Sequence, residues 1–320
     1  MNITELRENL EKFYINNTDG IVVYFILKDN NEMKVRLADI EHRFLRDLKD
    51  QYLSTIREMI INTNNTDVND LQVLNISTAD DRKNVIYEYD LEDKPKELSV
   101  INEILLNGEQ ENFSSSDNID NLFAYVITIG NNSDKLAIYR KHFPISKFSA
   151  QRNFLLFQSN QRFIRMENDM IRLDHKFDVI SIKGILFVNN LKLLEKSFGF
   201  HDIIKRKAEE NIKKIEFENI IEDSNSLLQE IDNISFARKI VKNSSNSPVL
   251  GIVPANSIIE FTKNHPHLRG KLKYSIDGSK IKLDTKVSKE LFLKLLSDNF
   301  LQSELTKAYY ESLAKDNLDL

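Results

Sequence analysis

The sequence predicts an α+β protein of two domains, in which mixed or antiparallel sheets built from hairpins pack against helices. Short apolar segments of strand length occur in adjacent pairs, and several pairs flank turns rich in Asn, Asp or Gly. Segments with apolar residues at helical spacing precede the first three pairs. At 320 residues, the chain is long enough to bury one large core or two modest ones.

Three helix–strand–strand units are expected in the first part of the chain. Thr4 is the candidate cap of the first helix, although Arg7 stands where a capping box needs an acid or amide. The units share a topology but no side-chain similarity. The expected elements are helix 3–14 with strands 20–28 and 33–38, helix 39–60 with strands 71–77 and 84–90, and helix 95–106 with strands 122–129 and 135–142.

The chain after Pro144 is expected to hold further strands and then mainly helices. The most apolar stretch, 179–188, is interrupted by Lys183 and Gly184 and is too short to cross a bilayer, so work at a membrane would require a partner. The charged segment 1–14 lacks the apolar core of a signal peptide. The expected elements are strands at about 162–167, 177–182 and 185–189, helices to about 263, a hairpin at 271–283 and a helix at 288–301.

Charge is divided unevenly along the chain. Residues 1–120 contain 13 Lys and Arg against 25 Asp and Glu, whereas residues 121–320 contain 31 against 24. The balance changes sign across the polar segment 108–121, which is the expected linker. We therefore predict an acidic N-terminal α+β domain, 1–120, for partner docking or assembly, and a basic C-terminal domain, 121–320, for DNA binding. Simple solvation explains the acidic part equally well.

A basic surface is predicted from the window 233–276, in which Glu260 is the only acid. The window begins with a short helix that carries three cations and for which Ser235 is the expected cap. The loop 243–247 offers small side chains that suit phosphate oxygens. The helix expected over 201–221, which precedes this window, is also rich in Lys, but expected pairs such as Glu209–Lys213 make it a solvated or dimer-packing helix.

The hairpin after this window carries the more specific signal. Asp277–Gly278 is typical of a two-residue type I′ turn, whose register places four lysines on one face and four apolar residues on the other. Lys273 lies opposite Lys282, an unfavourable like-charge pair that a polyanion would relieve. Lysines that merely block edge-to-edge association are the alternative. The candidate DNA-binding residues, all as phosphate neutralisers, are Arg238, Lys239, Lys242, Arg269, Lys271, Lys273, Lys280 and Lys282.

No catalytic motif accompanies these features, and catalysis is not expected. The absence of Cys excludes disulfides, a thiolate nucleophile and Cys-ligated zinc or iron–sulfur sites. A metal-dependent nuclease is the alternative, with Asp174, Asp178 and Lys183 as its candidates. His265 and His267 flank a proline and are expected at the surface or near phosphate. No catalytic residue, metal ligand or cofactor is assigned.

Two blocks carry a resemblance to a known family. The first is a tight hairpin and short helix, FDVISIKGILFVNN over 177–190 followed by LKLLEKSFGF over 191–200. The second is FLKLLSDNFLQSELT over 292–306, with Tyr309 and Tyr310 and then Ala314–Lys315 behind it. We interpret Ser303–Thr306 as the end of a helix. Together these blocks, over roughly 121–316, resemble the KwaB-like family, the soluble component of the Kiwa anti-phage defence system.

The resemblance implies a cytoplasmic protein that works with an integral membrane subunit, KwaA, and acts against invading phage DNA by binding it. It also implies self-association, as a homodimer or a larger assembly. Because the matching blocks are mostly apolar, they indicate a fold more securely than a chemistry. We expect a phage-defence protein that binds duplex DNA largely without sequence preference at the inner face of the membrane. A nuclease and an assembly adaptor that does not touch DNA are the alternatives.

Overall fold

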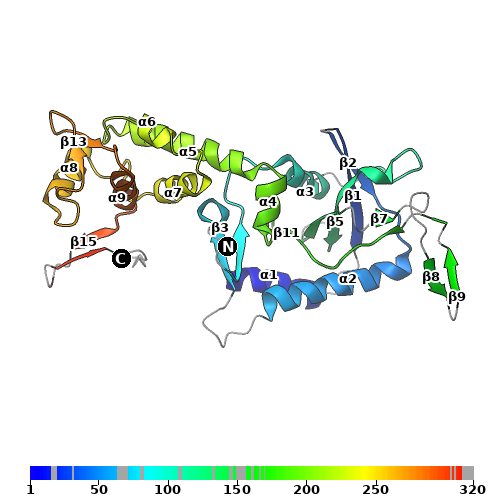
Figure 1. The fold of residues 1–320 in the computed structure, drawn as a ribbon. Helices are drawn as coiled ribbons and strands as arrows, with labels where there is room; N and C mark the ends of the chain where they lie inside the picture. The colour runs from blue at the N-terminus through cyan, green and yellow to red at the C-terminus, as the bar shows by residue number, and fades with distance from the viewer. Residues whose placement is uncertain are drawn as a thin grey trace. The chain divides into compact units, whose positions relative to one another are not determined.

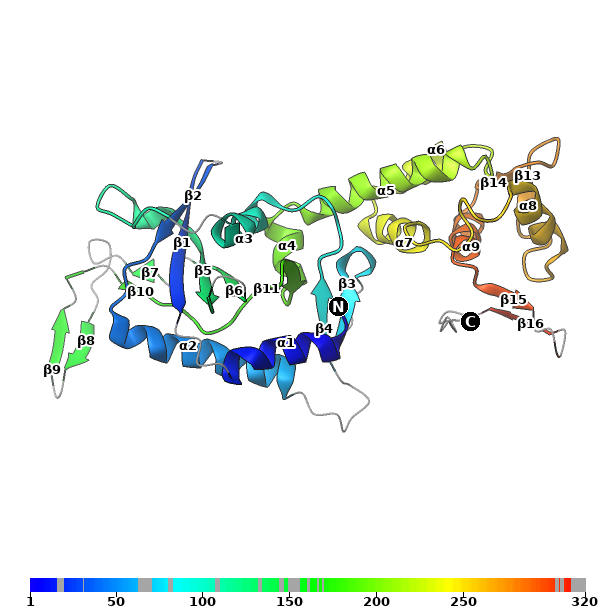
Figure 2. The same cartoon turned by 180° about the vertical axis from the view of Figure 1, so that it is seen from behind.

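An eight-stranded sheet forms the largest element of the computed structural model (Figures 1 and 2). Its strand order is β2-β1-β5-β6-β11-β12-β4-β3, and helices accompany it, so the predicted α+β class is confirmed. The residues that the structure describes are 1–15, 20–30, 32–62, 71–79, 83–106, 110–131, 134–143, 147–148, 156–159, 162–165, 167–168, 170–302, 305 and 308–311.

Neighbouring strands of this sheet are antiparallel, except that β3 and β4 run parallel. The second expected strand pair is therefore not a hairpin: a short helix, Ile76–Thr78, follows β3, and the chain returns before β4 begins. The strands are β1 Ile21–Asp29, β2 Glu32–Leu37, β3 Gln72–Asn75, β4 Val85–Glu88, β5 Leu122–Ile129, β6 Leu136–Lys141, β11 Val179–Ile182 and β12 Ile185–Val188.

Both faces of the central strands are buried, which explains their nearly continuous apolar sequence. The helices α1 (Ile3–Ile15) and α2 (His42–Ile56) pack on one face, where Tyr125 is 2% exposed. On the other side lies α3 (Lys96–Leu106), which contacts β2 and β6 (Figure 1). The amphipathic helix expected over 39–60 is thus present, with its last turn widened into a π-helix over Arg57–Ile61.

The cap of the first helix, Asn2, lies two residues before the predicted cap, and the helix begins at Ile3. The N–H of Glu5 donates to Oδ1 of Asn2 at 2.9 Å, and the N–H of Asn2 donates to Oε2 of Glu5 at 2.9 Å. This is a complete capping box, shifted relative to the Thr4–Arg7 spacing. The prediction of Thr4 as cap was wrong because Asn2 offers the same acceptor chemistry two residues earlier.

The central hairpin of the matched blocks follows its predicted turn. Lys183 has φ of 50° and Gly184 has φ of 77°, the two positive angles that a type I′ turn requires. Ile182 pairs with Ile185 across this turn. A short helix, α4 (Leu191–Ser197), follows the hairpin and ends before Gly199, whose φ of 64° stops it as the sequence indicates.

The chain separates into two compact units, Met1–Ile76 with Asp81–Phe198, and Ser77–Asp80 with Gly199–Leu320. The division lies at Phe198–Gly199 and not at residue 120, because β1 and β5 on either side of the expected linker pair in one sheet. Part of that segment is bonded to the sheet: the N–H of Leu37 donates to the C=O of Glu111 at 2.8 Å. The acidic residues of 1–120 and β5 to β12 therefore share one unit.

The second unit is built mainly from helices, with two small hairpins. The helix expected over 288–301 ends at Leu296, before Ser303–Thr306, and residues 300–302 form a strand instead. Of that tetrapeptide, only Leu305 is among the described residues. The elements are α5 Phe200–Phe217, α6 Asn225–Leu228, α7 Ile234–Ser244, α8 Ala255–Asn264, β13 Lys273–Tyr274, β14 Ile281–Lys282, α9 Lys286–Leu296, β15 Phe300–Gln302 and β16 Tyr309–Glu311.

Candidate nucleic-acid interface

The hairpin β13–β14 presents its lysines on one face, as its sequence predicts. Lys273 is the Cα partner of Lys282. The apolar face is turned inward, and Leu272 and Leu283 are each 4% exposed. Because side chains alternate across a strand, the opposite face projects outward. That face carries Lys271 and Lys273, which are exposed, and Lys280 and Lys282, which are half-buried.

The turn of this hairpin differs from the predicted two-residue type I′ turn. Gly278 has φ of 71°, but Asp277 is not among the described residues with positive φ, and a type I′ turn needs both. The N–H of Ser275 donates to the C=O of Lys280 at 2.9 Å and so closes a four-residue loop. Asp277 accepts bonds from the hydroxyls of Ser275 (2.5 Å) and Ser279 (2.7 Å), which lower its pKa. This local side-chain bonding selects the longer loop.

Two of the hairpin lysines are offset by the protein's own carboxylates. Nζ of Lys273 lies 2.9 Å from Oδ2 of Asp284, and Nζ of Lys282 lies 3.3 Å from Oε2 of Glu222. The hydrogen bond from Lys273 lowers the pKa of Asp284, which therefore stays ionised at neutral pH. The like-charge repulsion across the hairpin is thus partly relieved within the molecule, in favour of the alternative that needs no polyanion.

The cations of α7 lie on a different element from the hairpin. Nζ of Lys239 is 3.1 Å from Oε1 of Glu290, whereas Lys242 is exposed and Arg238 is half-buried. The cap of this helix is Asn233, whose Oδ1 accepts from the N–H of Ser235 at 3.1 Å, so the prediction of Ser235 as cap was wrong. The structure pairs Lys273 with Lys282 across the hairpin, with Lys271 and Lys280 just outside the paired residues, whereas the α7 cations lie on a separate element.

Four of the eight candidate cations form no salt bridge within the described ranges. They share an exposed or half-buried position on the second unit, and three of them belong to the hairpin or the turn before it. These four residues are Lys242, Arg269, Lys271 and Lys280. They are the positive charges most available to an external anion, and we call them the open cations.

The two histidines near Arg269 do not both lie at the surface as expected. His265 is 3% exposed, and its ring centroid lies 4.9 Å from that of Tyr309 and 5.4 Å from that of Phe300. Its Nδ1 accepts from the N–H of His267 at 3.3 Å. Burial, with a smaller contribution from the His267 charge, lowers the pKa of His265, which keeps the ring neutral at pH 7. His265 is therefore part of an aromatic core.

The carboxylates of the nuclease alternative are bound by an arginine. Nε and Nη2 of Arg140 contact Asp174 at 2.9 and 2.8 Å, and Nη1 contacts Oδ1 of Asp178 at 2.9 Å. Asp178, which is 0% exposed, also accepts from the N–H of Lys141 at 2.8 Å and from Nδ2 of Asn190 at 2.7 Å. Although burial favours the neutral acid, the Arg140 guanidinium holds the pKa of Asp174 below its usual value.

This network does not assemble a metal centre with Lys183. Asp178 precedes β11 and Lys183 follows it, so five residues of extended chain, about 16 Å, separate their Cα atoms. Among the described ranges, no three His, Asp or Glu side chains gather as ligands of one ion. The geometry supports a structural role for the arginine and the two aspartates, in which a buried ion cluster satisfies its own hydrogen bonds.

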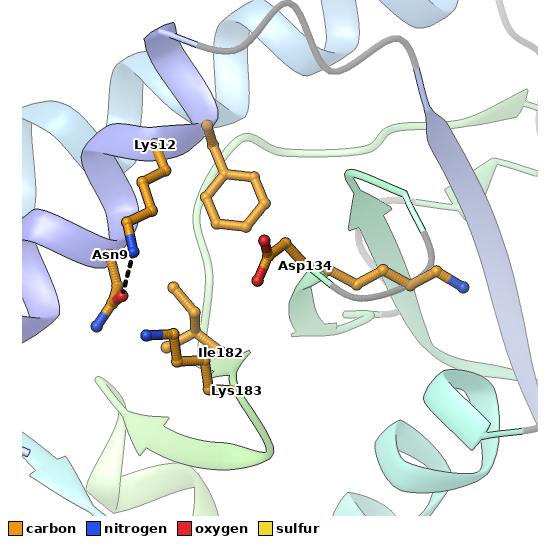
Figure 3. Close-up of a pocket in the computed structure, with 7 residues that line it drawn as sticks. Asn9, Lys12, Asp134, Ile182 and Lys183 are labelled. Atoms are coloured by element: carbon orange, nitrogen blue, oxygen red, sulfur yellow. Dashed lines mark hydrogen bonds between the residues drawn. The ribbon is translucent and has the colours of Figure 1, made fainter.

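A small cavity lies between α1 and the turns of the hairpins β5–β6 and β11–β12 (Figure 3). Its volume is about 30 Å³, room for about two water molecules. Asp134 and Lys183 extend toward it from the two turns, and Nζ of Lys12 donates to Oδ1 of Asn9 at 3.2 Å on its helical side. A cavity of this size does not accept a nucleotide or a similar substrate.

Two cations that the sequence assigned to internal ion pairs are also open. In the described part of α5, the expected pairs Glu209–Lys213 and Glu210–Lys214 do not form, and Lys207 binds Glu210 at 3.1 Å instead. Lys213 and Lys214 line a hollow of about 450 Å³ at the ends of α5 and α7. The i, i+4 spacing shows which pairs are possible on a helix, but the side-chain rotamers decide which of these weak surface pairs form.

An exposed aromatic ring stands at the same hollow. Phe217 is 88% exposed, and the serines 244, 245 and 247 line the other wall. This region was missed from the sequence alone. The available signal was that Phe217 is a large apolar residue outside the buried stripe of its helix. Within the part of the chain that the structure describes, none of the helices combines the length and apolarity needed to cross a bilayer.

Comparison with known proteins gives two concordant findings. The profile of the family described as Kiwa protein KwaB-like matches residues 119–306, close to the span predicted from the two blocks. A curated relative, Kiwa protein KwaB of Escherichia coli O55:H7 (strain RM12579 / EPEC), is 31% identical over 323 residues and covers 100% of both chains. No solved structure matches the chain significantly.

Proposed function

This chain belongs to the Kiwa protein KwaB-like family, and on that premise we propose that it defends against phage by binding duplex DNA. Binding uses phosphate contacts and is largely independent of sequence. The observation that carries the proposal is the outward face of β13–β14, on which lysines of both strands stand side by side above a buried apolar face. The contacts are Arg238, Lys239, Lys242, Arg269, Lys271, Lys273, Lys280 and Lys282.

The chemistry of this face favours backbone contacts over base reading. A Lys ammonium is a compact point charge that binds phosphate without the planar fork by which Arg reads guanine. Lys271 and Lys280 supply open charges, whereas Lys273 and Lys282 must exchange Asp284 and Glu222 for phosphate. Exposed ion pairs of this kind are weak, so a polyanion competes for them effectively.

We further propose that a membrane partner of the KwaA type holds the protein at the inner face of the cell membrane and that the chain forms a homodimer or a larger assembly. Residues 1–120 supply a net acidic surface. Cytoplasmic loops of membrane proteins carry excess Lys and Arg, which would attract such a surface. Pull-down of the full chain with a membrane subunit encoded beside it, with and without 0.5 M salt, tests this part of the proposal: an electrostatic contact is lost at high salt.

The DNA proposal is tested by reversing the hairpin charge. A variant with Lys271, Lys273, Lys280 and Lys282 all changed to Glu is compared with wild type in a gel-shift assay at low salt, with duplexes of unrelated sequence. Wild type is expected to shift every duplex with similar affinity. The variant is expected to lose the shift, because four phosphate contacts become repulsions.

A matched control separates the hairpin from net charge. Four lysines of the first unit are exposed and form no described salt bridge, and their reversal to Glu changes the net charge by the same amount. They are Lys34, Lys96, Lys192 and Lys196. An equal loss of binding in both variants would remove the hairpin as the site. A wild-type protein that shifts no duplex at low salt would favour the assembly adaptor.

A further inference from the structure

A two-stranded ribbon extends away from the eight-stranded sheet of the first unit in both views (Figures 1 and 2). It consists of β8 (Leu156–Ser159) and β9 (Arg162–Arg165), which pair with each other and with no other described strand. All four residues of β9 are exposed. The chain enters and leaves this region near a second small pair, β7 (Lys147–Phe148) with β10 (Met170–Ile171).

The ribbon exposes large apolar side chains on both of its faces. Phe163 is 68% exposed, Leu156 is 52% exposed and Ile164 is 46% exposed. The register places Phe163 with Arg165 on one face and Ile164 with Arg162 on the other. An isolated two-stranded hairpin is only marginally stable in water, and contiguous exposed apolar groups mark a surface that another molecule covers.

Basic residues predominate in the sequence before and within the ribbon, and a described acid, the exposed Glu167, follows two residues after β9. Residues 135–166 contain seven Lys and Arg and no Asp or Glu, a longer acid-free stretch than any part of the window 233–276. Arg140 is bound by the buried aspartates, but Arg162 is exposed and forms no salt bridge to a described residue. The occupant of this surface is therefore an anion with an apolar interior, which describes a nucleic acid duplex and its stacked bases.

We propose that the β8–β9 ribbon inserts into a groove of duplex DNA, with Arg162 and Arg165 on the phosphates and Phe163 against the bases. This inference rests on the proposed DNA-binding function and adds a second, independent contact to it. A two-stranded ribbon has the width of a DNA groove. Apolar side chains that enter between base steps unstack them and kink the duplex by about 20–90°. A second copy of the chain is the less favourable occupant, because paired ribbons would bring like-charged arginines together.

The test uses the full chain and a duplex of about 30 base pairs that carries a fluorescent donor and acceptor at its two ends. Wild type is expected to raise energy transfer on binding, because the kink brings the ends together. The double variant Arg162→Ala/Phe163→Ala is expected to bind about tenfold more weakly and to lose the rise in energy transfer, since it removes a phosphate contact and the wedge.

The chain itself supplies a matched control. Lys96 and Leu106 stand at the two ends of α3, where Lys96 is exposed and Leu106 is 83% exposed. The variant Lys96→Ala/Leu106→Ala also removes one positive charge and one large apolar side chain in the same unit, and α3 lies apart from the ribbon in both views (Figures 1 and 2). It is expected to leave DNA affinity and energy transfer at their wild-type values, and circular dichroism checks that both variants are folded.

The outcomes separate this inference from the proposed function. If the ribbon variant keeps wild-type affinity and energy transfer while the reversed hairpin variant fails to bind, the ribbon proposal is overturned and DNA binding through β13–β14 stands. If the ribbon variant changes the oligomeric state in sedimentation and leaves DNA binding intact, the ribbon contacts another copy, which also overturns the proposal. Binding by neither wild type nor variants overturns both.

Discussion

The Arg140 cluster of the first unit and the lysine face of β13–β14 in the second unit treat charge in opposite ways. The three guanidinium nitrogens of Arg140 donate to Asp174 or Asp178 at 2.8–2.9 Å, and Asp178 is wholly buried. The hairpin lysines stay at the surface, where partners such as Asp284 hold some of them loosely. Opposite charges enclosed in a core depend on each other, because loss of one leaves the other buried and unpaired, whereas charges left in water remain available to a ligand.

This difference shows why a count of charges along the sequence does not measure a binding surface. Residues 121–320 carry a net positive charge. The charge of Arg140, however, is cancelled by Asp174 and Asp178 and adds nothing to the positive potential at the surface. Conversely, Lys213 and Lys214 lie in a segment where Lys and Glu alternate, and both nevertheless line a hollow at the surface. Both the buried cluster and the surface lysines can be tested by substitution.

The largest effect is expected from Asp178→Ala. The substitution removes the acceptor of Nη1 of Arg140, of the N–H of Lys141 and of Nδ2 of Asn190, while Nε and Nη2 of Arg140 keep Asp174. We expect a loss of about 3–5 kcal/mol in the free energy of unfolding. Urea unfolding followed by circular dichroism measures it. Asp284→Ala, which removes the acceptor of an exposed lysine, is the control and should change the unfolding midpoint far less.

A second test concerns the salt dependence of DNA binding. If about five phosphates are neutralised, the slope of log K against log salt is about −4 to −5. Fluorescence anisotropy over a range of NaCl concentrations gives this slope. An affinity that does not change with salt would contradict the assignment of the hairpin and α7 cations as phosphate neutralisers.

A third test compares an open with a paired cation on the same helix. Lys242→Ala is expected to reduce the slope of the salt plot by about 0.9 and to weaken binding severalfold. Lys239→Ala is expected to weaken binding less, because Lys239 is already bound to Glu290. The same anisotropy titration reads both variants, and Glu290→Gln should strengthen binding by releasing Lys239. Equal effects of the two Lys variants would show that the ion pair has no influence.

The smallest effect is expected from pH. Burial lowers the pKa of His265 in the folded protein relative to its unfolded value near 6.5, so the unfolded chain binds the proton more readily. The stability that this neutral ring contributes is complete above pH 6.5 and is lost as the pH falls from there toward the folded pKa. Thermal unfolding between pH 7.5 and 5.5 should show the loss, and His265→Phe should reduce it. Because the N–H of His267 donates to Nδ1 of His265 and its Nε2 lies 3.5 Å from Oε2 of Glu311, His267→Phe is the control.

Much of the fold follows from local patterns in the sequence. The register of β13 with β14 follows from strand alternation around a turn signal. The turn at Lys183–Gly184 follows from a glycine between two apolar strands, and the two positive φ angles confirm it. The parallel pairing of β3 with β4 was missed because strand direction depends on where the connecting segment returns the chain. The two caps were misplaced for a simpler reason, namely that Asn2 and Asn233 offer acceptors equal to those predicted.

The candidate site was likewise predicted only in part from the sequence. Sequence alone determined that the hairpin lysines share a face, because alternation within one short segment leaves no freedom. It also determined the family, through two mostly apolar blocks, 177–200 and 292–306, that both lie within the residues matched by the family profile. Of the ribbon at 156–165, the strand expected at about 162–167 is confirmed as β9, whereas its partner β8 was missed.

Tertiary structure alone decided which of these charges remain open. Glu222, Asp284 and Glu290 reach the lysines from other segments of the chain, and Asp174 and Asp178 reach Arg140 across a sheet. An ion pair forms over a few ångströms, and the residues that it joins can lie anywhere along the sequence. Local patterns therefore fixed where the positive side chains point, and folding fixed which of them still lack a partner.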